Sequence, residues 1–177
     1  MATTTRIATS RPRRYGAVDV YYPDTGGATA AVVLASDPRF AAIVTEHTAH
    51  LTEVAEYRPG AFFQRELPAI RAVLSDIDPV DMLIIDGYVH LDPHGTPGLG
   101  TYVHEEYRVP VIGVAKSFFH TARHAIEVRR GTAARPLYVT AAGLDPRHAA
   151  NLVRDMAGPF RMPDALRRVD ALSRTGR

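Results

Sequence analysis

Met82-Leu83-Ile84-Ile85-Asp86-Gly87 is the stretch that decides the fold, because four apolar residues run without interruption into a carboxylate and a glycine. Such a run predicts a buried strand that ends at Asp86. Earlier in the chain, Ala17-Val18-Asp19-Val20-Tyr21 places a second carboxylate inside an apolar strand. A carboxylate in these surroundings loses its hydration, which is costly unless a cation or several donors replace the water. We therefore expect Asp19 and Asp86 to hold a divalent metal ion.

A third strand of the same kind leads to a cation instead. Pro110-Val111-Ile112-Gly113-Val114-Ala115 precedes Lys116, the only lysine among the 21 basic residues. Between Asp86 and this strand the chain has a loop rich in glycine, proline and histidine (87–98) and a short predicted helix (99–107). Strand, helix and strand in succession predict a parallel crossover. In such open sheets ligands bind beyond the carboxyl ends of the parallel strands, where Asp86 and Lys116 fall.

The other predicted elements surround this unit in the sequence. Three short β-rich runs with the spacing of an antiparallel meander come first, at residues 15–22, 28–36 and 41–49. A helix follows at 60–76, with Pro68 as the main objection to a straight course. Two more strands (125–130 and 136–141) and two helices (145 to about 157, and 162 to the end) complete the chain. This order predicts an α/β fold of the RNase H-like type, in which an antiparallel three-stranded meander and then parallel strands form one mixed sheet with helices on both faces.

The composition indicates one domain. A chain of 177 residues with 46% hydrophobic side chains can bury one sizeable core, and we expect a flexible arm at residues 1–13 before a single domain at 14–177. The absence of cysteine excludes disulfides and thiolate ligands, so the chain favours magnesium, or manganese, held by oxygen or imidazole. No secretion signal and no run of about 18 apolar residues occurs, which predicts a cytoplasmic protein without a membrane partner.

Charge is distributed unevenly along the chain. Residues 40–110 carry 11 acidic side chains against 4 arginines, whereas residues 121–177 carry 11 arginines against 5 acidic side chains. The first stretch is typical of cation binding and the second of a surface that binds a polyanion. The alternative is an arginine-rich composition whose charges are scattered over solvated faces.

Glu66 completes the predicted cation site, because it lies close to the apolar face of the 60–76 helix. With Asp19 and Asp86 it would supply the hard oxygen ligands that Mg²⁺ prefers, while Lys116 would stabilise charge on a phosphoryl group. Three other interpretations stay open at this stage. Glu66 could be a solvated side chain paired with Arg65 or Arg71, Asp86-Gly87 could be an ordinary turn at the end of a strand, and Lys116-Ser117 could simply end its strand.

Tyr57-Arg58-Pro59-Gly60-Ala61-Phe62-Phe63 combines a rigid turn with three aromatic rings. Such a segment can insert into a base stack, as in proteins that extrude a nucleotide. Alternatively, the two phenylalanines belong to the core and Pro59-Gly60 begins the helix. Among the eight histidines, His120 and His124 have the spacing of a metal pair but no third ligand nearby, so surface histidines are the default interpretation.

Taken together, these motifs resemble the endonuclease V family in order and spacing. The resemblance rests on four segments and extends over roughly residues 15–172: Val18-Asp19-Val20, Tyr57 to Pro68, Ile84-Ile85-Asp86-Gly87 and Ile112 to Ser117, with support from Pro136 to Thr140 and Met162 to Asp170. It implies a magnesium-dependent nuclease of the RNase H-like fold that recognises deoxyinosine in DNA, or inosine in RNA. Such an enzyme cuts the second phosphodiester bond on the 3′ side of the inosine and acts in DNA repair.

The resemblance also implies roles for individual residues. Asp19, Glu66 and Asp86 match the family's acidic metal and catalytic residues, Lys116 matches its catalytic lysine, and Asp170 falls where a further residue lies near the metal. The strand-separating wedge would be Tyr57, Arg58 and Pro59. The pocket for the flipped base would be lined by Gly60, Phe62, Gly87, Gly98, Leu99, Gly113 and Phe119, where glycines let backbone groups approach the base edge.

Three departures from the family pattern leave the substrate open. Tyr88, Asp92 and Leu144 stand where the family usually has histidine. We therefore expect an endodeoxyribonuclease that leaves 5′-phosphates, favoured as a monomer, with two alternatives: an inosine-specific endoribonuclease, and a non-catalytic relative that binds nucleic acid. The presence of all four ionisable groups, Asp19, Glu66, Asp86 and Lys116, argues against the non-catalytic relative. A protein that only binds nucleic acid has no need of buried acids that repel phosphate when no metal is bound.

Overall fold

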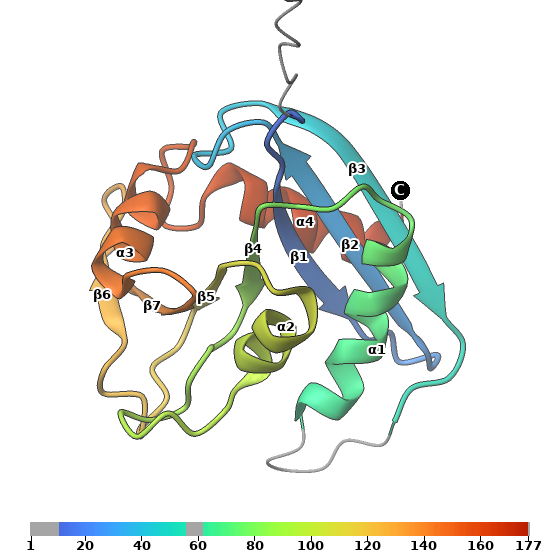
Figure 1. Ribbon diagram of the computed structural model, residues 1–177, viewed down its shortest axis with the longest axis horizontal. Coiled ribbons are helices and arrows are strands. Elements are labelled where there is room, and N and C mark those ends of the chain that lie inside the picture. The colour runs from blue at the N-terminus through green and yellow to red at the C-terminus, as the bar shows by residue number, and fades with distance from the viewer. Residues whose placement is uncertain (1–10, 56–61, 177) are drawn as a thin grey trace, which may run out of the picture.

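The structure is a computed structural model that describes residues 11–55 and 62–176. Within these ranges seven strands form one sheet in the order β3-β2-β1-β4-β5-β7-β6 (Figure 1). The strands are β1 (Tyr15–Tyr21), β2 (Ala28–Ala35), β3 (Ile43–Leu51), β4 (Met82–Asp86), β5 (Val111–Ala115), β6 (Ile126–Val128) and β7 (Leu137–Ala142). Neighbours in β3-β2-β1 and β5-β7-β6 are antiparallel, whereas β1, β4 and β5 run parallel. The predicted mixed sheet, with its meander and parallel centre, is confirmed.

Helices cover both faces of the sheet, as expected. On one face lie α1 (Phe62–Ser75) and α2 (Leu99–Tyr107), in front of the sheet in Figure 1. On the other lie α3 (Pro146–Asp155) and α4 (Asp164–Thr175). Each face has its own core, and successive strand residues alternate between the two: Val18 packs with α1 and α2, whereas Ala17 and Ile84 pack with α3 and α4. No helix in the described part of the chain is long and apolar enough to cross a membrane.

The same alternation decides which way the candidate residues point. Asp19 is two residues after Ala17, Asp86 is two after Ile84, and Lys116 is two after Val114, which packs in the α3 and α4 core. Side chains two residues apart in a strand share a face. All three therefore point toward the face that α4 covers.

Local sequence explains where the elements begin and end. Asp145 caps α3 by accepting a hydrogen bond from the His148 amide, 2.9 Å away, with a proline in the first turn. Helix α1 continues through Pro68 without a break. The strand predicted at 41–49 was wrong by two residues, because the Asp37 carboxylate accepts from the amides of Arg39 and Ala41 and extends the turn before β3.

Candidate functional site

The carboxyl ends of the three parallel strands bring the candidate residues together. Val18 pairs with Ile85 in register, so the next position along each strand places Asp19 beside Asp86. On the other side of β4, Asp86 pairs with Val114, two residues before Lys116. One edge of the sheet therefore carries Asp19, Asp86 and Lys116 side by side, as the sequence predicts for parallel strands.

Lys116 forms ion pairs within this group. Its Nζ donates to Asp86 Oδ2 at 2.8 Å and lies 3.8 Å from Asp170 Oδ1 on α4. Burial lowers the pKa of Lys116, but the hydrogen bond to Asp86 and the charges of Asp86, Asp170 and Asp19 outweigh it, so the pKa is raised overall. The lysine is therefore held as a cation against the carboxylates.

Asp170 and Asp19 are fixed by α4. The guanidinium of Arg174 donates to both carboxylate oxygens of Asp170, at 3.1 and 3.3 Å, and lowers its pKa. The Asp19 Oδ2 accepts from Ser173 Oγ at 2.8 Å. Burial raises the pKa of Asp19, and the charges of Asp86 and Asp170 raise it further against the opposing effects of Ser173 and Lys116. Asp19 is thus a carboxylate whose surroundings favour added positive charge.

Glu66 reaches the same edge from the other face of the sheet. It is only 7% exposed, and burial raises its pKa to about 8, with further contributions from the charges of Asp19 and Asp86. The interpretation of Glu66 as a solvated partner of Arg71 is wrong, because Arg71 binds Glu106 instead, at 2.6 and 2.7 Å. Arg65 does lie nearby, but its guanidinium stacks over the Tyr22 ring at 3.9 Å.

Two small cavities meet at Asp19 and Asp86. Glu66 lines the first cavity, and Lys116 and Asp170 line the second. Within residues 11–55 and 62–176, no three His, Asp or Glu side chains already surround a single point as a metal ligand set. The donors nevertheless fit Mg²⁺ or Mn²⁺, because such ions are usually held by one or two carboxylates, water and substrate phosphate. Burial and, after it, the repulsion between these carboxylates raise the pKa of Asp19 and of Glu66, and a bound divalent cation would offset both effects.

A third cavity, of about 270 Å³, lies beside this edge. Four of the seven residues predicted for the base pocket line it, namely Gly87, Gly98, Leu99 and Phe119, together with Phe63, Tyr88, Leu91 and Pro97. Gly98 is required there, since a Cβ at this position would lie 2.5 Å from the Tyr88 carbonyl oxygen. The volume is close to the lower end of small-molecule pockets, about 300–1,000 Å³.

The remaining predicted pocket and wedge residues are placed differently. Gly113 lies outside the lining of this cavity and packs under the β4 turn, where a Cβ would meet the Gly87 carbonyl oxygen at 2.6 Å. Tyr57, Arg58, Pro59 and Gly60 lie outside the described residues, as does the side chain of Phe62.

The three departures from the family pattern have structural roles. Tyr88 Oη donates to the Ser117 carbonyl at 2.7 Å and accepts from the Phe119 amide at 3.0 Å, which joins two walls of the third cavity. The Asp92 carboxylate accepts from the amides of His94 and Thr96 and so closes its own loop. Leu144 packs against the core under α3.

Sequence reasoning missed Ser173 and the bridging role of Tyr88. Ser173 stands three residues after Asp170, which puts both on one side of α4. The i, i+3 spacing was a signal for it. His120 and His124 form no metal site with a third acidic or histidine ligand among the described residues.

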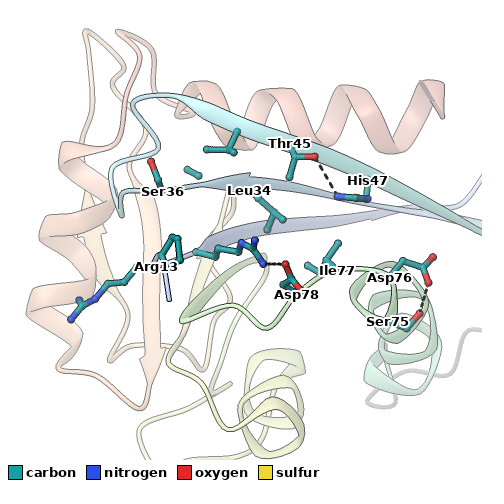
Figure 2. A pocket seen from close by; sticks show the side chains of 13 residues that line it. Arg13, Leu34, Ser36, Thr45, His47, Ser75, Asp76, Ile77 and Asp78 are labelled. Carbon is teal, nitrogen blue, oxygen red and sulfur yellow. Dashed lines mark hydrogen bonds and ion pairs between the residues drawn. The ribbon is translucent and has the colours of Figure 1, made fainter. Parts of the chain in front are cut away.

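A larger cavity, of about 630 Å³, lies elsewhere. Its lining comes from the residues before β1, the end of β2, the first half of β3 and the end of α1 with the residues after it (Figure 2). These segments sit at the opposite end of the sheet from Asp86. Its charged groups are partly paired with one another, as Arg14 is with Asp78. Cavity size alone therefore does not locate the chemistry.

Comparison with known proteins identifies the family. The model of the endonuclease V family matches residues 2–134. The chain belongs to the endonuclease V family. The resemblance seen in the sequence is confirmed, and with it the assignment to a family of nucleases.

Individual relatives agree with this assignment. Endonuclease V of Streptomyces avermitilis is 28% identical over 182 residues, covering 91% of this chain and 79% of the relative. The crystal structure of endonuclease V from that organism superposes with a TM-score of 0.77 at 27% identity, covering 92% of this chain and 80% of that one. Endonuclease V of Ciona intestinalis, solved in complex with a 23mer DNA containing an inosine followed by a ribo-adenosine, gives a TM-score of 0.72 at 17% identity, with coverage of 95% and 86%.

Proposed function

We propose that this chain is a divalent-metal-dependent endonuclease that recognises deoxyinosine in DNA and hydrolyses the second phosphodiester bond on its 3′ side. The observation that carries the proposal is the convergence of Asp19, Asp86 and Lys116 at the ends of three parallel strands, with Glu66 reaching the same edge. A base-sized cavity lies beside them. The inosine-containing DNA in the Ciona intestinalis complex supports the choice of lesion.

The chemistry is hydrolysis of a phosphodiester. The oxygen of a water molecule forms a bond to phosphorus, the bond from phosphorus to the 3′ oxygen breaks, and the proton passes to that oxygen, leaving a 3′-hydroxyl and a 5′-phosphate. A Mg²⁺ or Mn²⁺ ion held by Asp19, Asp86 and Glu66, with Asp170 close by, would supply Lewis-acid stabilisation of the phosphoryl oxygens.

The chain's own residues supply the rest. Lys116 presents a fixed positive charge where charge develops on the phosphoryl group or on the leaving oxygen. Glu66 is buried beside the same cavity as Asp19 and Asp86, where its carboxylate would complete the oxygen ligands and orient the attacking water. Ser173 and Arg174 keep Asp19 and Asp170 in place.

Base recognition would take place in the third cavity. Phe63 and Phe119 line it with aromatic rings, and nothing lies within 4 Å of where a Cβ at Gly87 would stand, so a ligand can approach the backbone there. An extruded base is recognised by stacking and by hydrogen bonds to its edge. The predicted wedge of Tyr57, Arg58 and Pro59 would separate the strands beside the flipped nucleotide.

The test is cleavage of matched oligonucleotides, in DNA and in RNA, each with a single inosine and each paired with an adenine control. We expect Mg²⁺-dependent cleavage of the inosine DNA, loss of cleavage in EDTA, and loss of cleavage in Asp86→Ala. Product ends are determined by ligation and by phosphatase treatment. Cleavage of the RNA alone would replace the proposal with the endoribonuclease, and binding without cleavage in Mg²⁺ or Mn²⁺ would replace it with the non-catalytic relative.

A further inference from the structure

A groove of about 500 Å³ opens next to the proposed catalytic cavity. Its lining comes from the β6–β7 turn, the α3–α4 loop and α4: Thr132, Ala133, Pro159, Phe160, Arg161, Met162 and Arg167. We call it the Phe160 groove. Met162 lines both this groove and the cavity of Asp86, Lys116 and Asp170, so the two are adjacent.

Phe160 is a large apolar side chain that lies exposed in this groove. Its ring is 56% exposed, and among the described aromatic rings none stacks on it. The guanidinium of Arg167 lies over the ring, 4.7 Å from its centre. An exposed ring with an arginine beside it is the combination that stacks unpaired bases in single-stranded nucleic acid sites.

A buried arginine holds the loop that carries this ring. Arg130 is only 6% exposed, and its guanidinium donates to five backbone carbonyls rather than to a carboxylate. The acceptors belong to Arg154, Met156, Gly158, Phe160 and Arg161, at distances from 2.5 to 3.4 Å. A charged group in such a position is costly to bury unless its hydrogen bonds are made. Phe160 is therefore presented on a rigid loop and needs no ordering when a ligand arrives.

Two more contacts fix the groove relative to the catalytic lysine. Gly131 has φ of +56°, and a Cβ there would lie 2.3 Å from the Pro159 carbonyl oxygen, so the turn and the loop approach as closely as only glycine permits. The guanidinium of Arg161 donates to the carbonyl of Pro136, at 2.8 Å, and to that of Lys116. The floor of the groove and the end of β5 thus move as one body.

We propose that the Phe160 groove binds an unpaired nucleotide of the substrate strand next to the scissile phosphate, with its base on the Phe160 ring and its phosphate at Arg167. The inference rests on the proposed function only in taking nucleic acid as the substrate. It adds a subsite that reads no particular base, because every base has a face that can stack. The guanidinium of Arg167 is half exposed and lies 3.7 Å from the Asp164 carboxylate, which leaves it able to meet a phosphate in place of that contact.

The absence of tryptophan from the chain allows a direct test. Phe160→Trp places the chain's single tryptophan in the groove, where it can be excited apart from the eight tyrosines, and keeps an aromatic face. The variant is titrated, in EDTA to prevent cleavage, with single-stranded inosine oligonucleotides trimmed stepwise from either end. We expect the fluorescence to be quenched by long oligonucleotides, and the quenching to disappear once trimming from one end removes the stacked nucleotide.

Affinity measurements on the same oligonucleotides complete the test. Phe160→Ala should weaken binding of long oligonucleotides by about 5- to 150-fold, the range for stacking of one base. On the oligonucleotide trimmed past that base, the variant and the wild type should bind equally well. Arg167→Gln should reduce the slope of log affinity against log salt by about 0.7, the value for one phosphate of a single strand. Arg147→Gln, an exposed change in the first turn of α3 and outside the lining of the groove, should alter neither.

The results that would overturn the inference are specific. Unquenched Phe160→Trp fluorescence with a wild-type protein that binds and cleaves inosine DNA would refute the groove and leave the proposed function standing. The groove would also be refuted, with the proposed function still standing, if Phe160→Ala weakened the binding of all oligonucleotide lengths equally or of none. A wild-type protein that binds no oligonucleotide would instead refute both, and circular dichroism of the exposed variants establishes that they are folded.

Discussion

Replacing Glu66 by glutamine should make the metal-free protein more stable at high pH and change little at low pH. Glu66 is 7% exposed, and burial raises its pKa from an ordinary 4.5 to about 8. Below pH 4.5 the carboxyl is protonated in both the folded and the unfolded chain, so folding carries no penalty. Between pH 4.5 and 8 the unfolded chain has lost the proton while the folded chain keeps it. Stability therefore falls as pH rises through this window and then stays low.

The size of the effect follows from the two pKa values. The difference between 4.5 and about 8, at 1.36 kcal/mol for each pH unit, gives about 5 kcal/mol as an upper figure. Water entering the adjoining cavity would reduce it, so we expect about 2–4 kcal/mol. For a domain of this size, roughly 2–4 °C in Tm for each kcal/mol gives a shift of about 5–15 °C.

The assay is urea unfolding of the wild type and Glu66→Gln in EDTA, at about pH 5 and about pH 9. Glu105→Gln, an exposed change on α2, serves as the matched control and should alter the free energy of unfolding little at either pH. Addition of Mg²⁺ at the higher pH should stabilise the wild type more than the glutamine variant. Equal stabilities at the higher pH, or a gain for the variant only at the lower pH, would refute the argument that burial and neighbouring charge dominate Glu66.

Three other changes test separate contacts. Lys116→Met removes the ammonium 2.8 Å from Asp86 and should lower the cleavage rate of inosine DNA by about 10²–10³-fold in single-turnover assays with little change in DNA affinity; an unchanged rate would contradict its role. Ser173→Ala leaves the Asp19 carboxylate without its donor and should weaken Mg²⁺ affinity or activity by about 10–100-fold, measured as the Mg²⁺ concentration for half-maximal cleavage. Arg130→Met leaves buried carbonyl groups without their hydrogen-bond donor and should lower the free energy of unfolding, measured in urea, by at least about 3 kcal/mol. A decrease of less than about 1 kcal/mol would show that the loop is not held by Arg130.

The central strands could be predicted from sequence because their signal is local. The run from Met82 to Asp86 and the run before Lys116 are uninterrupted apolar stretches, and strand, helix and strand in order leave few possible topologies. Asp19, Asp86 and Lys116 follow from these strand ends. The start of β3 was wrong because it depends on a side chain, Asp37, that competes with the backbone for hydrogen bonds.

Other parts of the site are set by contacts that no local pattern contains. Ser173 reaches Asp19 across 154 positions of sequence, and the packing of α4 on β1 decides that contact. The sequence could not distinguish a buried Glu66 from a solvated Glu66 paired with Arg71. The structure distinguishes them, because Arg71 pairs with Glu106 on the neighbouring helix instead. The hydrogen bonds of Arg130 likewise join a turn to a loop about 30 residues away. In the sequence Arg130 is one arginine among many, and nothing there indicates these contacts.

The position of α4 in the chain bears on how the protein is made. Ribosomes synthesise α4 after every other described element, yet it packs on β1 and β2 and contributes both Ser173 and Asp170. A nascent polypeptide that has emerged only as far as α3 still exposes the apolar face that includes Val33 and Ile84, and it lacks two side chains of the proposed cleavage centre. Under the proposed function, the centre therefore assembles only after α4 has been translated.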